Sequence, residues 1–107
     1  MKITINNSSK GKIVEVNGFL NKKNVSILSD TLQSLIEQNT PGIILDLKDL
    51  SYMDSAGISV FIACKKDIES RGGRMALLQP NKNVLFLLQL VALDDFFSII
   101  NKEEEFV

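Results

Sequence analysis

The sequence predicts a single α/β domain over residues 1–107, in which a mixed central sheet is flanked by helices. Near the start, apolar and polar residues alternate, which is typical of a β-hairpin. Further along, segments with helical periodicity alternate with short apolar runs. Strands that alternate with helices favour parallel pairing in one layered domain. The predicted order of elements is therefore β-β-α-β-α-β-α-β.

The N-terminal third is predicted to form the hairpin. Residues 2–6 alternate in polarity as a short strand does, and residues 7–11 are rich in turn-forming types. Residues 12–17 alternate again, with a mixed pattern that indicates a strand covered on both faces for part of its length. We expect residues 18–20 to leave the sheet.

An amphipathic helix is predicted to begin near Asn24 and to stop at residues 40–42, where Thr, Pro and Gly follow one another. Apolar residues spaced by three and four form its buried stripe: Val25, Leu28, Leu32, Leu35 and Ile36. Residues 43–47 are a continuous apolar run with one acid, which suits a central parallel strand buried on both faces.

A second helix is predicted over residues 56–70, with Gly72 and Gly73 as its stop. The first half is apolar nearly all round, whereas the second half is charged. The first half is therefore either deeply buried or covered by a partner. Its core stripe is expected to consist of Gly57, Phe61, Cys64 and Ile68.

The C-terminal part continues the alternation. Residues 74–79 read as a strand, and either Asn81 or Asn83 can cap a third helix over residues 84–90. A last short strand is expected over residues 96–100, followed by a helical turn. The third helix is more apolar than one buried face requires, so it belongs either to the core or to a self-association surface such as that of a weak homodimer.

Composition excludes several functional classes. The net charge of −1 offers no basic face for nucleic acid. With no histidine and one cysteine, neither a Ser-His-Asp triad, nor a structural zinc site, nor an internal disulfide can form. The longest apolar stretch, residues 84–93, is too short to enter and span a membrane. We expect a cytoplasmic protein without a secretory leader, metal or cofactor, and a solvated turn at the acidic residues 103–105.

Residues 45–57 are the most informative part of the chain. A buried strand ends in a short polar loop that delivers Ser55 to the start of an apolar helix. A hydroxyl there lies among unpaired backbone N–H groups at the positive end of the helix dipole, where a phosphate is stabilised. The same serine could instead present a small patch to a partner or act only as the N-cap.

Three aspartates near this loop allow a second interpretation. Asp46, Asp49 and Asp54 could together bind Mg²⁺, as the acids of a phosphorylated receiver domain do. A receiver would also need an acidic pair after its first strand, and residues 18–21 contain no acid. We therefore favour structural roles, in which Asp46 binds loop amides and Asp54 assists the helix cap.

Residues 42–80 resemble the STAS domain of bacterial anti-sigma-factor antagonists. The matching motifs are Ile-Leu-Asp-Leu at residues 44–47, Tyr-Met-Asp-Ser-Ala-Gly-Ile at residues 52–58, Arg-Gly-Gly-Arg at residues 71–74, and Pro80. The order of strand, serine loop, helix, glycine pair and strand agrees throughout, and a weaker match continues to Phe97.

This resemblance implies a non-enzymatic binding module in a partner switch. Ser55 would be phosphorylated by a serine protein kinase that is also the anti-sigma factor. The unmodified antagonist would bind that kinase and free its target. The phosphorylated form would not bind, and a serine phosphatase would return it to the unmodified form. Asn21 stands where the family usually has an aspartate, so it keeps hydrogen-bonding capacity but loses the charge. The expected partner-binding residues are Asn21, Asp54, Ser55, Ala56, Gly57, Ile58, Ser59 and Ile62. At least one of Ile58, Ser59 and Ile62 is expected to be exposed beside Ser55.

Two alternatives remain open. The chain could be a STAS scaffold subunit of a transport or sensory complex, where Ser55 is a contact without a phosphorylation switch. A small nucleotide-binding protein is disfavoured, because the chain lacks a Gly-x-x-x-x-Gly-Lys loop and histidine.

Overall fold

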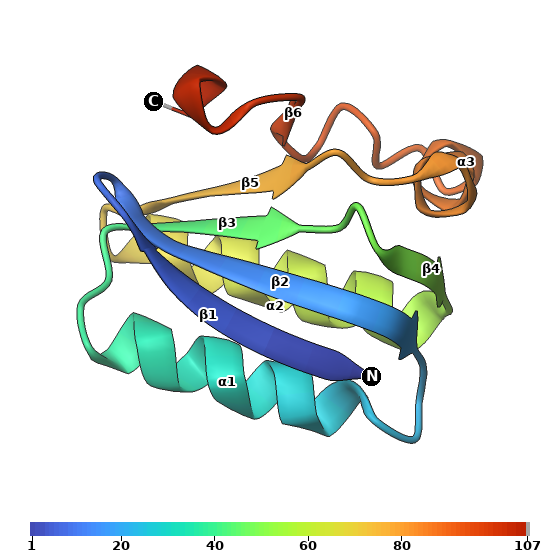
Figure 1. Cartoon of the computed structure of the whole chain (residues 1–107), viewed down its shortest axis with the longest axis horizontal. Coiled ribbons are helices and arrows are strands. Elements are labelled where there is room, and N and C mark those ends of the chain that lie inside the picture. Colours follow the sequence, from blue (N-terminus) through green and yellow to red (C-terminus); the bar gives the residue numbers. More distant parts are fainter. Residues whose placement is uncertain (107) are drawn as a thin grey trace.

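The structure, a computed structural model, describes residues 1–106 and shows a six-stranded mixed sheet with three α-helices (Figure 1). The elements in chain order are β1 (Lys2–Ser8), β2 (Gly11–Leu20), α1 (Val25–Glu37), β3 (Gly42–Asp46), β4 (Leu50–Met53), α2 (Ser55–Ser70), β5 (Arg74–Leu78), α3 (Lys82–Leu90), β6 (Ile99–Ile100) and the 3₁₀ helix η1 (Glu103–Glu105).

The sheet is built around a long, forked strand. Its main path runs β1-β2-β3-β5-β6, in which β1 and β2 are antiparallel and the other neighbours are parallel. The first part of β2 pairs with β3, whereas its last part pairs with β4 after a register shift between Gly18 and Phe19. The predicted mixed α/β architecture is thus confirmed.

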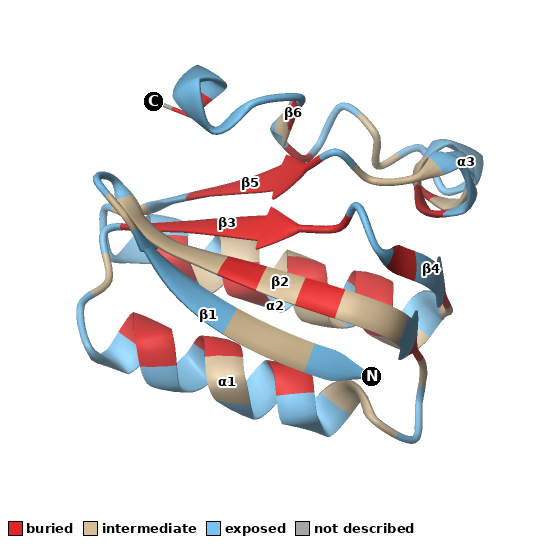
Figure 2. Ribbon diagram, viewed as in Figure 1, coloured by how far each residue is buried: buried red, intermediate tan, exposed pale blue. Residues whose placement is uncertain are grey.

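Helices α1 and α2 lie side by side under one face of this sheet (Figure 1). Alternation along β3 sends Ile43 and Leu45 into the core between the sheet and these helices, and Ile44 to the opposite face. Strand β3 is buried along its whole length and β5 over most of its length, as the red strands in Figure 2 show. Phe106 covers Ile44 from the outer side, in a second cluster that also contains Ala76, Leu78 and Ile100.

The three predicted α-helices are confirmed, and most of their ends lie close to the predicted positions. The stripe of α2 is buried as expected, and Gly72 follows that helix with φ +83°. Asn81, rather than Asn83, caps α3 by accepting a hydrogen bond of 3.1 Å from the Val84 N–H. Burial raises the pKa of the Cys64 thiol to about 12, so this cysteine is a small core residue, as predicted.

Four sequence expectations about strands differ from the structure. Residues 18–20 do not leave the sheet, because they continue β2 and pair with β4. Strand β4 itself was expected to be part of a polar loop. The first turn is shorter than predicted, since β1 continues to Ser8 and pairs it with Gly11. The last strand is limited to β6.

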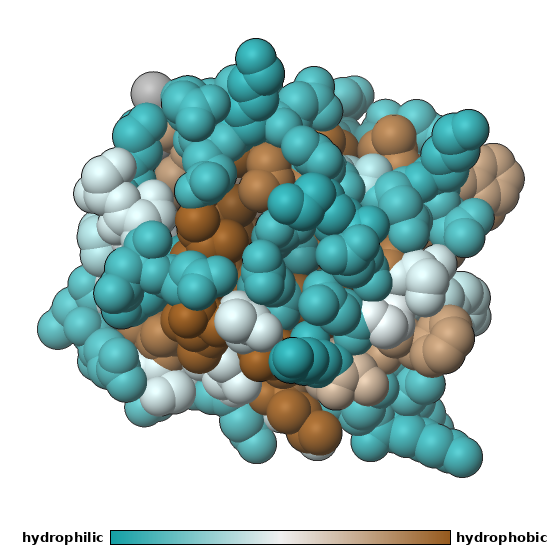
Figure 3. All heavy atoms as spheres, viewed as in Figure 1, coloured by the Kyte–Doolittle hydropathy of each residue, from teal (hydrophilic) through white to brown (hydrophobic). Residues whose placement is uncertain are grey.

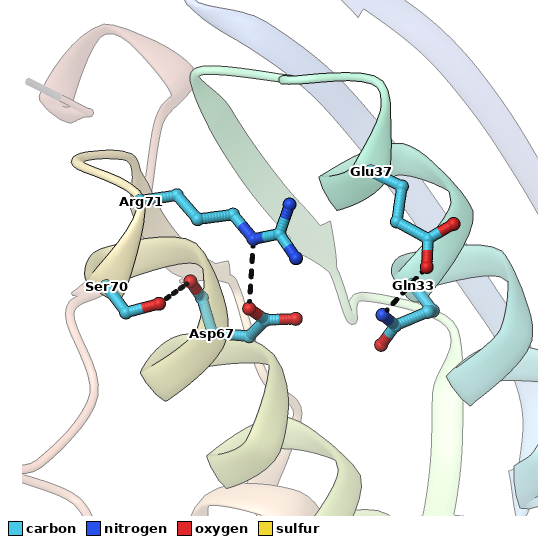
Figure 4. A network of polar contacts seen from close by, with 5 residues as sticks. All are labelled: Gln33, Glu37, Asp67, Ser70 and Arg71. Atoms are coloured by element: carbon cyan, nitrogen blue, oxygen red, sulfur yellow. Dashed lines mark hydrogen bonds and ion pairs between the residues drawn. The ribbon is translucent and has the colours of Figure 1, made fainter.

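The ends of α1 and α2 that lie away from Ser55 carry surface polar contacts (Figure 4). The Arg71 Nε donates to Asp67 Oδ1 at 3.1 Å, and the Gln33 amide donates to Glu37 Oε1 at 3.1 Å. Such exposed pairs, one helical turn apart, each stabilise a helix by about 0.2–0.5 kcal/mol. These two contacts stabilise their helices and are not part of a functional site. In the described part of the chain, the helices are too short or too polar to cross a bilayer.

Candidate functional site

Ser55 is the first residue of α2, at the end of the sheet toward which β2, β3 and β5 run (Figure 1). Its side chain is exposed. Among residues 1–106, the Ser55 hydroxyl has no hydrogen-bond partner, whereas its carbonyl accepts a bond of 3.1 Å from the Ser59 hydroxyl. The first N–H groups of a helix have no intrahelical acceptor, so this position favours an anion.

Asp54, not Ser55, is the N-cap of α2. Its Oδ1 accepts a hydrogen bond of 2.9 Å from the Ala56 N–H. Its Oδ2 accepts a bond of 3.1 Å from the Lys22 N–H in the β2–α1 loop. One carboxylate therefore stabilises the helix start and joins it to a loop more than thirty residues earlier. The interpretation of Ser55 as the cap is wrong, and its hydroxyl remains free for another use.

The β2–α1 loop is ordered by its own asparagines. The Asn21 Oδ1 accepts from the Lys23 N–H at 2.9 Å, and the Asn24 Oδ1 accepts from the Asn21 N–H at 2.9 Å. The Asn24 amide also donates to the Phe19 carbonyl at 2.8 Å. Asn21 thus forms an Asx turn within the loop, a role that its neutral side chain fills as an aspartate would.

The structure separates the predicted partner-binding residues into surface and core. Ser55 and Ser59 are exposed, and four others are half-buried: Asn21, Asp54, Ala56 and Ile62. Ile58 is only 6% exposed and packs in the core, so it does not present its side chain to a partner. The exposure of Ser59 confirms the prediction that at least one of Ile58, Ser59 and Ile62 is exposed.

Gly57 is also buried, and it sets how closely α2 approaches the sheet. A Cβ at this position would lie 2.9 Å from Leu20 Cδ2 and 3.2 Å from Met53 Cβ. Gly57 therefore shapes the surface around Ser55 from below, and the expectation that it contacts a partner directly is corrected.

The carboxylates near the loop have structural partners. The Asp46 side chain accepts from the Lys48 N–H at 3.2 Å, and its other oxygen lies 3.3 Å from Lys48 Nζ. The hydrogen bond to Asp46 raises the pKa of Lys48 above its usual value. As predicted, Asp46 binds a loop amide and Asp54 serves the cap. Within residues 1–106, no three His, Cys, Asp or Glu side chains lie close enough to hold a metal ion.

An apolar groove beside Ser55 was not found from the sequence. It has a volume of about 390 Å³ and lies between the β4–α2 junction and α3. The residues that line it are Tyr52, Met53, Asp54, Ser55, Asn83, Phe86, Leu87 and Leu90. The only signal in the sequence was the excess of apolar residues in α3, which did not say which of them are exposed.

Removing the cap should destabilise the site without removing Ser55. We expect Asp54→Ala to lower the free energy of unfolding by about 1–2 kcal/mol, because a helix cap and a loop contact are lost. Urea denaturation followed by circular dichroism measures this change. Ser55→Ala is the matched control and should change stability by less than about 0.5 kcal/mol. A loss with Ser55→Ala as large as that with Asp54→Ala would contradict the assignment of the cap.

Comparisons with known proteins agree with this geometry. The anti-sigma-B factor antagonist of Bacillus subtilis (strain 168) is 29% identical over 106 residues, which cover 97% of this chain and 96% of that protein. The solved structure of the anti-sigma factor antagonist SpoIIAA in its unphosphorylated form superposes with a TM-score of 0.81 at 23% identity, covering 96% of this chain and 91% of the other. The phosphorylated form of the Bacillus SpoIIAA has a TM-score of 0.75 at 22% identity, covering 96% and 95%. These two structures support the fold. The model of the STAS domain family matches residues 2–106, and the chain therefore belongs to that family.

Proposed function

We propose that this protein is an anti-sigma-factor antagonist that is controlled by phosphorylation of Ser55. In its unmodified form it binds an anti-sigma factor with serine kinase activity, and this binding releases the target of that factor. The observation that carries the proposal is the exposed Ser55 hydroxyl, which has no partner among residues 1–106 and lies next to an intact helix cap. The name of the Bacillus subtilis relative supports the same function.

The position of Ser55 permits phosphorylation without unfolding. A phosphate adds about −1.5 to −2 charges at neutral pH. The helix dipole stabilises such a charge in the first turn by about 0.3–1 kcal/mol. Within the described residues, no hydrogen bond of the Ser55 side chain has to break, since the capping bonds belong to Asp54. The fold therefore tolerates both forms.

The same phosphate opposes binding. At a protein interface it must be desolvated, and it repels acidic groups of the partner. A difference of about 3 kcal/mol between the two forms changes the affinity by more than a hundredfold. A surface switch of this size requires no rearrangement of the sheet or helices.

In this scheme the protein itself catalyses no reaction. The kinase activity belongs to the anti-sigma factor, and a separate serine phosphatase removes the phosphate. The carboxylates of Asp46 and Asp54 are each engaged by backbone amides.

The first test is intact-mass spectrometry, with site mapping, of the protein purified from the cells that produce it naturally. We expect a fraction that carries one phosphate on Ser55 and loses it in Ser55→Ala. The unmodified protein should recover a partner with kinase activity toward Ser55, and titration calorimetry should then show that Ser55→Asp weakens binding at least tenfold.

A matched control places the same charge elsewhere. Ser34 is exposed on α1, so Ser34→Asp should leave the affinity within twofold. If no phosphate is found on Ser55 in any growth phase and Ser55→Asp binds as the unaltered protein does, the antagonist function is wrong. A constitutive scaffold role would then replace it.

A further inference from the structure

Exposed apolar side chains gather around Ser55. Tyr52, Phe86 and Leu90 are 52%, 60% and 65% exposed, and all three line the groove that also contains Ser55. Phe19, 59% exposed, lies opposite Tyr52 in the pairing of β2 with β4. Figure 3 shows apolar side chains at the edge of the molecule where α3 lies. Contiguous apolar patches of this kind mark interaction sites in a folded protein.

Hydrogen bonds and core packing hold α3 against β4 beside the groove. The Asn81 amide donates to the Leu50 carbonyl at 2.5 Å, and the Asn83 amide donates to the Ser51 carbonyl at 3.2 Å. These bonds fasten the start of α3 to β4. On the inner side of α3, Val84 and Leu88 are buried in the core. Phe86 is therefore presented outward on a rigid helix, together with Leu90 one turn later.

Exposed lysines lie next to residues that line the groove, in the chain or through a backbone hydrogen bond. Lys22 and Lys23 are exposed on the loop that is joined to Asp54, and Lys82 precedes the groove residue Asn83. Among the described residues that line the groove, Asp54 is the only acid, and both of its carboxylate oxygens accept backbone N–H groups. Acidic side chains on a bound segment would complement the charge of these lysines.

We propose that this groove binds an amphipathic segment of the anti-sigma partner. Apolar side chains of that segment fill the space between Tyr52, Phe86 and Leu90, and its acidic side chains pair with Lys22 and Lys23. This inference rests on the proposed function and identifies the chemistry of the partner's binding segment. A second copy of this chain fits less well, since the same face of that copy offers lysines rather than free acids.

The arrangement gives the phosphate two ways to oppose binding. Ser55 lies in the lining of the groove, so a phosphate there places charge beside the apolar contacts. The same phosphate repels the acidic side chains of the segment and competes with them for Lys22 and Lys23. Phosphorylation of Ser55 would thus remove the apolar contacts that the partner segment makes in the groove.

Photo-crosslinking in the cells that produce the protein tests the proposal. A benzophenone amino acid is introduced separately at Phe86, at Leu90, at Ser59 and at Ile5. Ser59 is exposed one turn after Ser55, and Ile5 is an apolar control that is 44% exposed on β1. Ultraviolet irradiation and mass spectrometry then identify each adduct and the crosslinked peptide.

We expect the probes at Phe86 and Leu90 to react with one protein that phosphorylates Ser55, through a peptide that contains both apolar and acidic residues. These adducts should disappear in Ser55→Asp, and the probe at Ile5 should not form them. With that purified kinase, Phe86→Ser and Leu90→Ser should each weaken binding at least tenfold, whereas Ile5→Ser should stay within twofold. Lys22→Glu combined with Lys23→Glu should weaken binding and reduce its dependence on salt.

Other outcomes overturn the proposal and separate it from the proposed function. If the kinase is captured only from Ser59, the groove inference is wrong and the antagonist function stands. If Phe86 and Leu90 crosslink to a second copy of the chain, the groove is a homodimer surface. If no position captures a protein that phosphorylates Ser55, both the inference and the proposed function fail.

Discussion

Replacing Phe61 with alanine is expected to lower the free energy of unfolding by about 3–5 kcal/mol. Phe61 is completely buried on α2, and its ring packs edge-to-face on Phe97 with 6.3 Å between centroids. Truncation to alanine removes buried apolar area and leaves a cavity that fixed strands and helices cannot fill. A typical domain has only about 5–15 kcal/mol of stability, so urea denaturation should show a large shift of the midpoint.

The same substitution on the surface provides the control. Phe86 is 60% exposed, so Phe86→Ala should change the free energy of unfolding by less than about 0.5 kcal/mol. The pair therefore separates a residue that maintains the fold from one that is assigned to binding. If both variants lost the same free energy of unfolding, Phe86 would belong to the core, and its assignment to a binding surface would be wrong.

Replacing Gly11 with alanine should destabilise the protein by about 3 kcal/mol or more, because backbone strain and overpacking add together. Gly11 begins β2 with φ +143°, a conformation that L-residues rarely adopt. A Cβ at this position would lie 2.0 Å from the carbonyl oxygen of Gly42, at the start of β3. Since the oxygen belongs to backbone, β2 and β3 would have to move apart where their parallel pairing begins.

Gly72 separates the two contributions. It also has a positive φ, +83°, but a Cβ there would meet nothing within 4 Å. Gly72→Ala should therefore cost only the backbone strain, about 1–2 kcal/mol. Thermal and urea unfolding of the two variants give the difference that is due to close packing. Equal losses in the two variants would mean that the strands separate without cost and that only the positive φ matters.

The sequence predicted the elements whose residues carry strong local patterns. The apolar run of β3 and the glycine stop after α2 appear in the structure, as does the buried stripe of α1, in which Val25 is only partly buried. The loop containing Ser55 was located correctly at the start of α2. These features depend on periodicity and on backbone preferences, which a single sequence records.

Features that depend on tertiary contacts were missed. Strand β4 has only four residues, and its ends are buried while Ser51 and Tyr52 are exposed, so it shows no alternation. It exists because the end of β2 supplies its hydrogen-bonding partner. Likewise, the apolar pattern of α3 could not show that Phe86 and Leu90 remain outside the core, since that depends on how β4 orients the helix.

The separation of the capping carboxylate from the Ser55 hydroxyl has a consequence for regulation over time. A modification that consumed the helix cap would change the lifetime of the protein together with its binding state. Here both capping hydrogen bonds belong to the Asp54 carboxylate, so modification of the Ser55 hydroxyl does not consume either acceptor. The phosphorylated and unmodified forms should therefore be degraded at similar rates. In the proposed switch, the fraction of active antagonist is then set by the opposing fluxes of kinase and phosphatase. It can be reset many times without new protein synthesis.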